Sequence, residues 1–172
     1  MDARDWKDMR NFTWRRQEIA EGCKRDDRHV HIVITSPKCR EVTPRCGKPS
    51  LQLFFYDLDP EAIRRTRAAG DDPVKAQELI EGCFSEAQAR ELAAFVEAHP
   101  EDVVANCEAG VSRSPGVVLA LRRKYGGDTE EVFRKACPNI HVASVLGREL
   151  GVGPFQARKF EGIVDPFVKD EP

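Results

Sequence analysis

The sequence predicts an α/β fold: a single domain in which a central mixed, largely parallel sheet is flanked by helices. Three observations support this fold class. Short β-branched or aromatic runs alternate with segments of helical periodicity, and only helical segments follow them. The chain has 172 residues, a length that suits one domain with its own core. Finally, a strand, a loop and a helix follow one another without a spacer over residues 103–125.

Composition and charge exclude several classes of protein. With 41% hydrophobic and 33% charged residues, 12 glycines and 11 prolines, the chain lies near the globular average. This composition argues against a disordered, collagen-like or repeat protein. The formal net charge of -2 offers no overall attraction for nucleic acid or for an anionic membrane, so neither is an expected partner. Any anion site must therefore be local.

The N-terminal segment and the cysteines favour a cytoplasmic location. The first residues, MDARDWKDMR, carry charges where a signal peptide needs an apolar core. No apolar stretch approaches the roughly 20 residues that span a bilayer. The six cysteines contain no C-x-x-C pair, so we expect free thiols and no metal site: Cys23, Cys39, Cys46, Cys83, Cys107 and Cys137.

Two strands are expected in the first third of the chain. Residues 1–28 are dense in charge, and their aromatic residues are spaced as in an amphipathic helix or an arm laid on the domain. Residues 29–35 (HVHIVIT) form a β-branched run before a Ser-Pro turn, which predicts a largely buried strand. Residues 51–56 (LQLFFY) predict a second strand. Asp57 and Asp59 follow it, so two carboxylates lie at its carboxyl end.

The middle of the chain is predicted to be mainly helical. Within residues 61–84, charged side chains surround few apolar positions, which favours a surface helix, a Gly-Asp-Asp-Pro break and a second helical piece. This segment could act as a lid. From Ser85 the capping-box pattern S-E-A-Q opens a helix that a His-Pro pair stops. Residues 103–105 (VVA) then predict a short buried strand.

The remaining elements are all helices. Residues 115–125 predict a helix whose end is marked by a basic run and then by two glycines. Residues 128–137 predict a second helix, closed by a Cys-Pro pair, and residues 139–150 predict a third. The tail, residues 152–172, holds aromatic residues among charges and is expected to pack loosely on the domain.

A cysteine and an arginine separated by five residues lie where the 103–105 strand meets the following helix. The segment reads Cys107-Glu-Ala-Gly-Val-Ser-Arg113-Ser114. A short loop between a strand end and a helix N-terminus turns backbone N–H groups inward, and it forms a concave anion site with the helix dipole behind it. Gly110 permits backbone angles that a side chain would resist, and the Arg113 guanidinium can bind the same anion through two donors. The pattern therefore predicts a phosphate-binding loop.

Cys107 is then the expected nucleophile. Helix N-termini and nearby cations favour the ionised thiol, so a cysteine in this loop should be a thiolate at neutral pH. A thiolate beneath a tetrahedral phosphate is placed for in-line attack, while the loop amides and Arg113 stabilise the charge on the oxygens. The product is a cysteinyl-phosphate that water must hydrolyse. Ser114 could donate a hydrogen bond to the departing sulfur.

This segment resembles the signature loop of the cysteine-dependent protein tyrosine phosphatases, especially the compact dual-specificity branch. Besides the cysteine and the arginine, Gly110 and Ser114 occupy the family's positions, and the flanking strand and helix agree. The resemblance covers about residues 30–150, although outside the loop it is a pattern of elements only. One departure is Asn106, which stands where the family has a histidine and is expected to affect the rate more than the reaction.

The resemblance implies a general acid on a loop after an earlier strand. Asp57 is our first choice, because it closes a strand as the family's acid does. Asp59, just beyond it, is the second candidate. Asp71 and Asp72 come third, in the longer segment that follows.

The sequence therefore predicts a protein tyrosine or dual-specificity phosphatase that needs no cofactor. The side chains expected to act in catalysis are those of Cys107, Arg113, Asp57 and Ser114. The residues expected to bind phosphate are Glu108, Ala109, Gly110, Val111, Ser112 and Arg113. The loop has no lysine, whereas lipid phosphatases that resemble this fold tend to carry extra basic residues there. Phosphotyrosine in a protein or peptide is therefore the favoured substrate, with phosphoserine and phosphothreonine as further candidates.

Two other functions stay open. A phospho-binding module would keep the loop but lack an effective acid, and Asn106 is consistent with it. An enzyme of the rhodanese or arsenate-reductase kind also uses a cysteine in an anion loop, but a sulfurtransferase has no use for Asp57. Turnover of an aryl phosphate, vanadate binding without turnover, and cyanide-dependent formation of thiocyanate distinguish the three.

Overall fold

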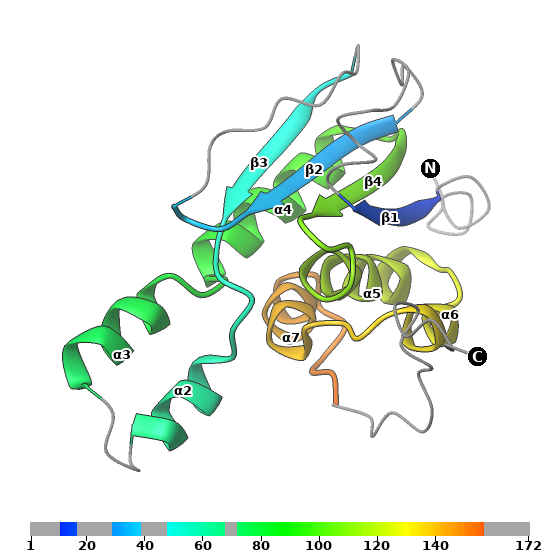
Figure 1. The fold of residues 1–172 in the computed structure, drawn as a ribbon. Coiled ribbons are helices and arrows are strands. Elements are labelled where there is room, and N and C mark those ends of the chain that lie inside the picture. Colours follow the sequence, from blue (N-terminus) through cyan, green and yellow to red (C-terminus); the bar gives the residue numbers. More distant parts are fainter. Residues whose placement is uncertain (1–10, 17–28, 39–47, 68–71, 157–172) are drawn as a thin grey trace, which may run out of the picture.

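The sheet determines the arrangement of the whole molecule. The computed structural model describes residues 11–16, 29–38, 48–67 and 72–156. Within them, four strands form one parallel sheet in the order β1-β4-β2-β3 (Figure 1). Their bounds are β1 Phe12–Arg16, β2 His29–Thr35, β3 Ser50–Phe54 and β4 Asp102–Cys107. Helices flank the sheet, so the predicted α/β fold is confirmed at this level.

The sheet differs from the prediction in the direction of its strands. Every strand pairing among the described residues is parallel, so the mixed sheet that we expected is wrong for this part of the chain. Parallel strands of one sheet cannot be joined by a tight turn, and the connection from β3 to β4, which lie on either side of β2, contains three helices in its described part. These helices are α2 (Pro60–Arg67), α3 (Pro73–Glu81) and α4 (Glu86–Ala98). The carboxyl ends of all four strands therefore meet at one edge of the sheet.

Between β4 and residue 156, where the description ends, three more helices follow: α5 (Arg113–Tyr125), α6 (Thr129–Lys135) and α7 (Ile140–Glu149). The helices predicted from residue 61 onwards are present, with ends that differ by a few residues. The capping box at the start of α4 is formed, because Ser85 and Gln88 each accept a hydrogen bond from the other's backbone N–H. Helix α7 packs against both α4 and α5.

Strand β1 was not predicted. We expected an arm or a helix over residues 1–28, but residues 12–16 form an edge strand paired in parallel with β4. Phe12 is buried in the main core and Trp14 packs against that core, so the aromatic residues alternate with a period of two, as a strand requires. The rest of the 1–28 prediction lies outside the described residues, apart from residue 11.

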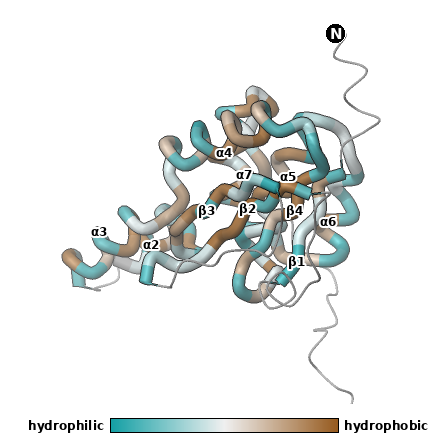
Figure 2. The backbone as a smooth tube through the Cα atoms, turned by 90° about the horizontal axis from the view of Figure 1, so that it is seen from above, coloured by the Kyte–Doolittle hydropathy of each residue, from teal (hydrophilic) through white to brown (hydrophobic). Residues whose placement is uncertain are grey.

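Both faces of the central strands are buried. Val30, Ile32 and Ile34 of β2 belong to the main core together with residues of α4, α5 and α7. His31 of β2 and Asn106 of β4 are buried polar side chains that are not part of this core. Strands buried on both faces read as near-continuous apolar runs, which explains the HVHIVIT pattern. Figure 2 shows hydrophobic segments gathered along the central strands and α5.

The α2–α3 segment leaves the sheet and returns to nearly the same point. The Tyr56 N–H donates to the Gly82 carbonyl oxygen at 2.7 Å, which joins the two ends of the excursion. A Cβ atom at Gly82 would collide with the Tyr56 ring, so this close approach requires glycine. Helices α2 and α3 lie beside each other and project from the rest of the molecule (Figure 1). The predicted break is consistent with these two helices, but residues 68–71 lie outside the described residues.

The described start of the tail, for which we expected loose packing, lies against the core. Phe155 is buried in the core, and its N–H donates to the Ser144 hydroxyl at 3.2 Å. Residues 157–172 lie outside the described residues. Among the helices that the structure describes, none combines the length and the apolar character needed to cross a membrane.

Candidate active site

The predicted anion loop lies at the carboxyl edge of the sheet. Cys107 is the last residue of β4, and Arg113 is the first residue of α5. Gly110 has φ of 68°, and a Cβ atom there would lie 2.8 Å from the Arg16 backbone nitrogen. The loop therefore closes against the end of β1, which only glycine permits. In open α/β sheets, this edge is where ligands bind.

Contacts on the outside of the loop hold its backbone. The Val111 carbonyl oxygen accepts a hydrogen bond from the Cys137 N–H at 3.0 Å, and the Ser112 carbonyl oxygen accepts one from the Asn139 N–H at 2.9 Å. Two loop carbonyls thus face the connection between α6 and α7. Ser112 is the N-cap residue of α5, yet its hydroxyl does not cap the helix. The Ser112 side chain therefore leaves the first N–H groups of α5 uncapped, which suits an anion site.

Cys107 lies beneath this loop with its thiol against the start of α5. Only 2% of the residue is exposed. Its Sγ is 3.0 Å from the Ser114 hydroxyl, and the Ser114 N–H donates to Sγ at 3.5 Å. Ser114 is itself fully buried. The structure therefore brings together the cysteine and the serine that the sequence singled out.

Arg113 is held in a fixed orientation although it begins a helix. It is 4% exposed, and its Nη1 donates to the Phe55 carbonyl oxygen at 3.1 Å and to the Ser36 hydroxyl at 3.3 Å. Nη2 lies 3.1 Å from Glu108 Oε2. Its Nε is buried and has no hydrogen-bond partner within the described part of the chain. Because a buried donor without a partner is unfavourable, this N–H is suited to an anion in the loop.

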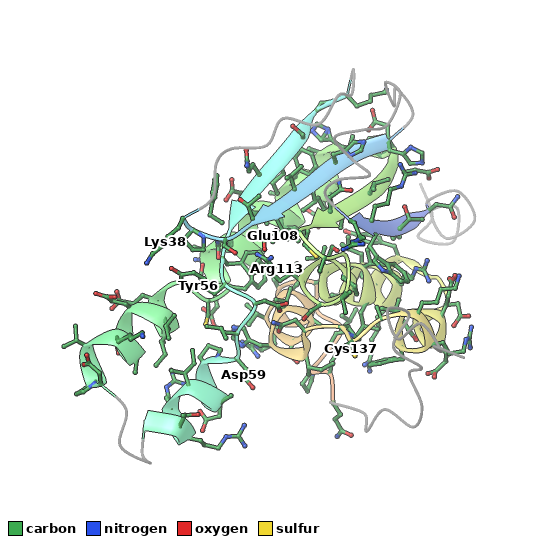
Figure 3. The ribbon with its side chains drawn as sticks, in the orientation of Figure 1. Lys38, Tyr56, Asp59, Glu108, Arg113 and Cys137 are labelled. Atoms are coloured by element: carbon green, nitrogen blue, oxygen red, sulfur yellow. The ribbon has the colours of Figure 1, made fainter. Side chains whose placement is uncertain are left out.

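Ser36 and Glu108 complete a closed ring of contacts around the guanidinium. The Ser36 hydroxyl donates to Glu108 Oε1 at 3.1 Å, while Glu108 Oε2 pairs with Arg113. The sequence prediction placed Glu108 in the phosphate loop, but it assigned no role to the carboxylate. Figure 3 shows Glu108 and Arg113 close together at the ends of the strands. The Glu108 side chain is 46% exposed, so a negative charge lies at the rim of the loop.

The first- and second-choice acid candidates have different surroundings. Asp57 Oδ1 accepts hydrogen bonds from the Ser112 hydroxyl at 2.7 Å and from Asn139 Nδ2 at 2.8 Å, so this exposed carboxylate is tied to the anion loop. Asp59 Oδ1 instead accepts from the Glu61 N–H at 2.8 Å at the start of α2. Figure 3 shows Asp59 beside that helix. The geometry therefore brings Asp57 to the loop.

Of the third-choice acids, the structure describes Asp72, and it is not brought to the loop. Asp72 is the N-cap residue of α3, and its carboxylate accepts a hydrogen bond from the Val74 N–H at 2.9 Å. Such a carboxylate stabilises a helix N-terminus, which accounts for its position. Asp71 lies outside the described residues.

Asn106 points away from the cysteine that follows it. Successive side chains of a strand lie on opposite faces, so the Asn106 amide is on the face of the sheet opposite Cys107. There its Nδ2 donates to His31 Nδ1 at 3.2 Å, and both residues are buried. Any influence of Asn106 on the thiol must therefore pass through the backbone.

Two residues of this site were missed by the sequence analysis: Ser36 and Asn139. Ser36 follows β2, and parallel strands bring the residues after their carboxyl ends together, so its position was a usable signal. Asn139 was recognised only as the start of a helix. Its contact with Asp57 joins residues 82 positions apart, and no local pattern carries that information.

No metal centre accompanies the loop in the described residues, where no three His, Cys, Asp or Glu side chains are placed to share an ion. No protein-family model matches the chain, and a search of curated proteins finds no significant match. The chemistry of the site therefore has to be argued from its own geometry.

Proposed function

We propose that this chain is a cysteine-dependent phosphomonoester phosphatase of the protein tyrosine or dual-specificity type. The observation that carries the proposal is the Cys107 thiol at the N-terminus of α5, beside a buried Arg113 whose Nε lacks a partner in the described residues. This arrangement offers a nucleophile and a cation to the same anion. Asp57, tied to the loop through Ser112, adds an acid at its rim.

The first half-reaction transfers the phosphoryl group to sulfur. The Cys107 thiolate attacks phosphorus as the bond from phosphorus to the leaving oxygen breaks, and the bonding pair goes to that oxygen. Asp57 donates its proton to the leaving oxygen. Arg113 and the N–H groups at the start of α5 stabilise the charge on the other three oxygens.

The second half-reaction returns the enzyme to its starting state. Asp57, now ionised, takes a proton from a water molecule whose oxygen attacks phosphorus. The sulfur–phosphorus bond breaks, and its electron pair returns to Cys107 as a thiolate. The Ser114 hydroxyl, 3.0 Å from Sγ, is placed to donate a hydrogen bond to that thiolate. Inorganic phosphate leaves.

The charges at the rim favour substrates with a single phosphate. The loop contains no lysine, and Nη2 of Arg113 is already paired with the Glu108 carboxylate. A second phosphate near Glu108 would meet a carboxylate rather than a cation, which is unfavourable. Phosphotyrosine in a protein or peptide fits this balance better than an inositol polyphosphate or an RNA 5'-triphosphate.

The proposal is tested by the hydrolysis of p-nitrophenyl phosphate and of a phosphotyrosine peptide over a range of pH. Cys107→Ser should abolish turnover, and Asp57→Asn should lower kcat by about 10²- to 10⁴-fold, which is the usual contribution of a general acid. Asp59→Asn is the matched control. It should keep kcat, because asparagine also caps a helix N-terminus.

The alternatives give different results. Binding of vanadate without turnover would indicate a phospho-binding module rather than an enzyme. Formation of thiocyanate from cyanide would indicate a sulfurtransferase. If Asp59→Asn rather than Asp57→Asn lowered kcat, the assignment of the acid would be wrong while the reaction class stood.

A further inference from the structure

Both hydrogen bonds that the described residues donate to the Asp57 carboxylate go to the same oxygen. The Ser112 hydroxyl donates to Oδ1 at 2.7 Å, and Asn139 Nδ2 donates to the same oxygen at 2.8 Å. Oδ2 is not engaged by either donor. Within the described part of the chain, the carboxylate is therefore bound on one side only.

Asn139 is itself held by the fold. It is the N-cap residue of α7, where its Oδ1 accepts a hydrogen bond from the Val142 N–H at 3.1 Å. Its own N–H donates to the Ser112 carbonyl oxygen at 2.9 Å. A Cβ atom at Gly116 would lie 2.6 Å from the Asn139 carbonyl oxygen, so α5 and the start of α7 are in close contact. With Oδ1 used for the cap, only the NH₂ group is left to face Asp57.

An amide NH₂ group can donate hydrogen bonds but cannot accept them. A proton on Asp57 Oδ1 could therefore be received only by the Ser112 hydroxyl, which would have to give up its own donation to Oδ1. A proton on Oδ2 instead leaves the hydrogen bonds from Ser112 and from Asn139 intact. The proton of the neutral acid is consequently placed on Oδ2. The ionised form keeps both hydrogen bonds on Oδ1, and so the carboxylate does not need to turn between the two states.

We propose that Asn139 is a positioning residue that makes Oδ2 of Asp57 the oxygen that gives and takes the proton, an inference that rests on the proposed function. In the first half-reaction the Oδ2 proton moves to the leaving oxygen as the phosphorus–oxygen bond breaks. In the second half-reaction Oδ2 takes the proton of the attacking water as the sulfur–phosphorus bond breaks. Asn139 touches neither the substrate nor the reacting atoms.

The test uses two substrates that differ in how much they need an acid. p-Nitrophenolate leaves readily without a proton, whereas phenolate from phenyl phosphate is more basic and needs one. Asn139→Ser removes the amide that reaches Asp57, but serine is an equally good N-cap for α7. Denaturant unfolding of the variant checks that the helix and the fold are kept.

We expect Asn139→Ser to lower kcat/KM for phenyl phosphate about tenfold more than for p-nitrophenyl phosphate, in the direction that Asp57→Asn also shows. In the Asp57→Asn background, Asn139→Ser should cause little further loss, because the two residues act as one unit. Asn139→Asp keeps the cap but places a second carboxylate against Asp57, so it should not rescue the activity on phenyl phosphate.

Equal losses on both substrates, or losses that multiply in the double variant, would show a structural role for Asn139 and overturn the inference. If Asp57→Asn itself had the same effect on both substrates, the acid assignment in the proposed function would fail, and this inference would fail with it. The two failures are therefore distinguishable.

Discussion

The orientation of Arg113 depends on residues that are far from it in the sequence. Ser36 lies 77 positions earlier and the Phe55 carbonyl oxygen 58 positions earlier, yet both accept hydrogen bonds from the same Nη1. Glu108 fixes the other terminal nitrogen. A guanidinium held this way has lost its rotamer freedom before an anion arrives, so less entropy is lost on binding.

Ser36 provides a direct check of this orientation. Ser36→Ala removes an acceptor for Arg113 and a donor to Glu108, so the guanidinium loses part of its support. A hydrogen bond of this kind contributes about 0.5–1.5 kcal/mol, so KM for p-nitrophenyl phosphate should rise by about 2- to 10-fold. Initial-rate kinetics measure the effect, with Ser36→Thr as the control that keeps the hydroxyl. An unchanged KM in Ser36→Ala would mean that the ring of contacts does not determine the orientation of the Arg113 guanidinium.

The shape of the loop after β4 depends on its contact with a neighbouring strand. Strand β1 runs along one side of β4, and the loop after β4 presses Gly110 against the backbone of Arg15 and Arg16. The loop therefore depends on an edge strand for its shape. Glycine is needed here both for its backbone angle and for its lack of a side chain.

A pair of glycine substitutions separates these two requirements. Gly110 and Gly151 have nearly the same φ, 68° and 70°, but a Cβ atom at Gly151 would meet nothing within 4 Å. Gly151→Ala should lower the free energy of unfolding by about 1–2 kcal/mol through its backbone alone. Gly110→Ala should cost more and should also reduce phosphatase activity.

Urea unfolding and initial rates measure both glycine variants. If Gly110→Ala were no less stable than Gly151→Ala and kept full activity, the close approach to β1 would not matter for the loop.

Helix α6 is joined to the rest of the fold by charged contacts. Arg122 of α5 donates from Nε to the Phe12 carbonyl oxygen at 3.0 Å, and its Nη1 pairs with Glu131 of α6 at 2.7 Å. Lys135 also pairs with Glu131, at 2.6 Å. Hydrogen bonds from Lys135 and from Arg122 lower the pKa of Glu131 below its ordinary value of 4.5.

The lowered pKa of Glu131 determines how its contribution to the free energy of unfolding changes with pH. A carboxyl group whose pKa is lowered in the folded state stabilises the fold above its ordinary pKa, and that contribution is lost as the pH falls through the folded value. Glu131→Gln should therefore lower the free energy of unfolding by about 0.5–1 kcal/mol at pH 7 and by less below pH 4. Glu97→Gln, an exposed position on α4, is the control. A loss from Glu131→Gln that stayed the same at both pH values would contradict this account.

At the scale of the whole molecule, the parallel sheet brings separate parts of the chain to one edge. The segments after β2 and β3 supply Ser36 and Asp57, and β4 ends with Cys107. Helix α7 begins beside them with its N-cap residue Asn139. The α2–α3 segment leaves this edge directly after Asp57. Its two ends are joined by the hydrogen bond between the Tyr56 N–H and the Gly82 carbonyl oxygen. The two helices are therefore accommodated without separating the site residues on either side of them.

Local patterns were enough to predict most of the fold and the loop. The run of residues 103–125 encodes a strand, a loop and a helix in consecutive residues, and the helix caps at Ser85 and Asp128 are formed within four residues. Strand β1 escaped prediction because its short alternation lies within a highly charged segment. Its identity as a strand depends on pairing with residues about 90 positions later.

The site residues that the sequence analysis did not predict were missed for the same physical reason. Ser36 and Asn139 act through side-chain contacts with distant residues, and one sequence does not specify such contacts. The choice between Asp57 and Asp59 depended on three-dimensional position in the same way. Which neighbour each carboxylate meets is determined by the path of the chain after β3.

The central claim is that Cys107 carries the phosphoryl group during turnover. Ser114→Ala removes the hydroxyl that lies 3.0 Å from Sγ. Its loss should slow the hydrolysis of the cysteinyl-phosphate, in which the thiolate departs, and should leave the formation of the cysteinyl-phosphate from p-nitrophenyl phosphate nearly unchanged. Mass spectrometry of acid-quenched Ser114→Ala protein should therefore find phosphate on Cys107 and on no other residue. Turnover without phosphate on Cys107, or phosphate on another residue, would contradict the account.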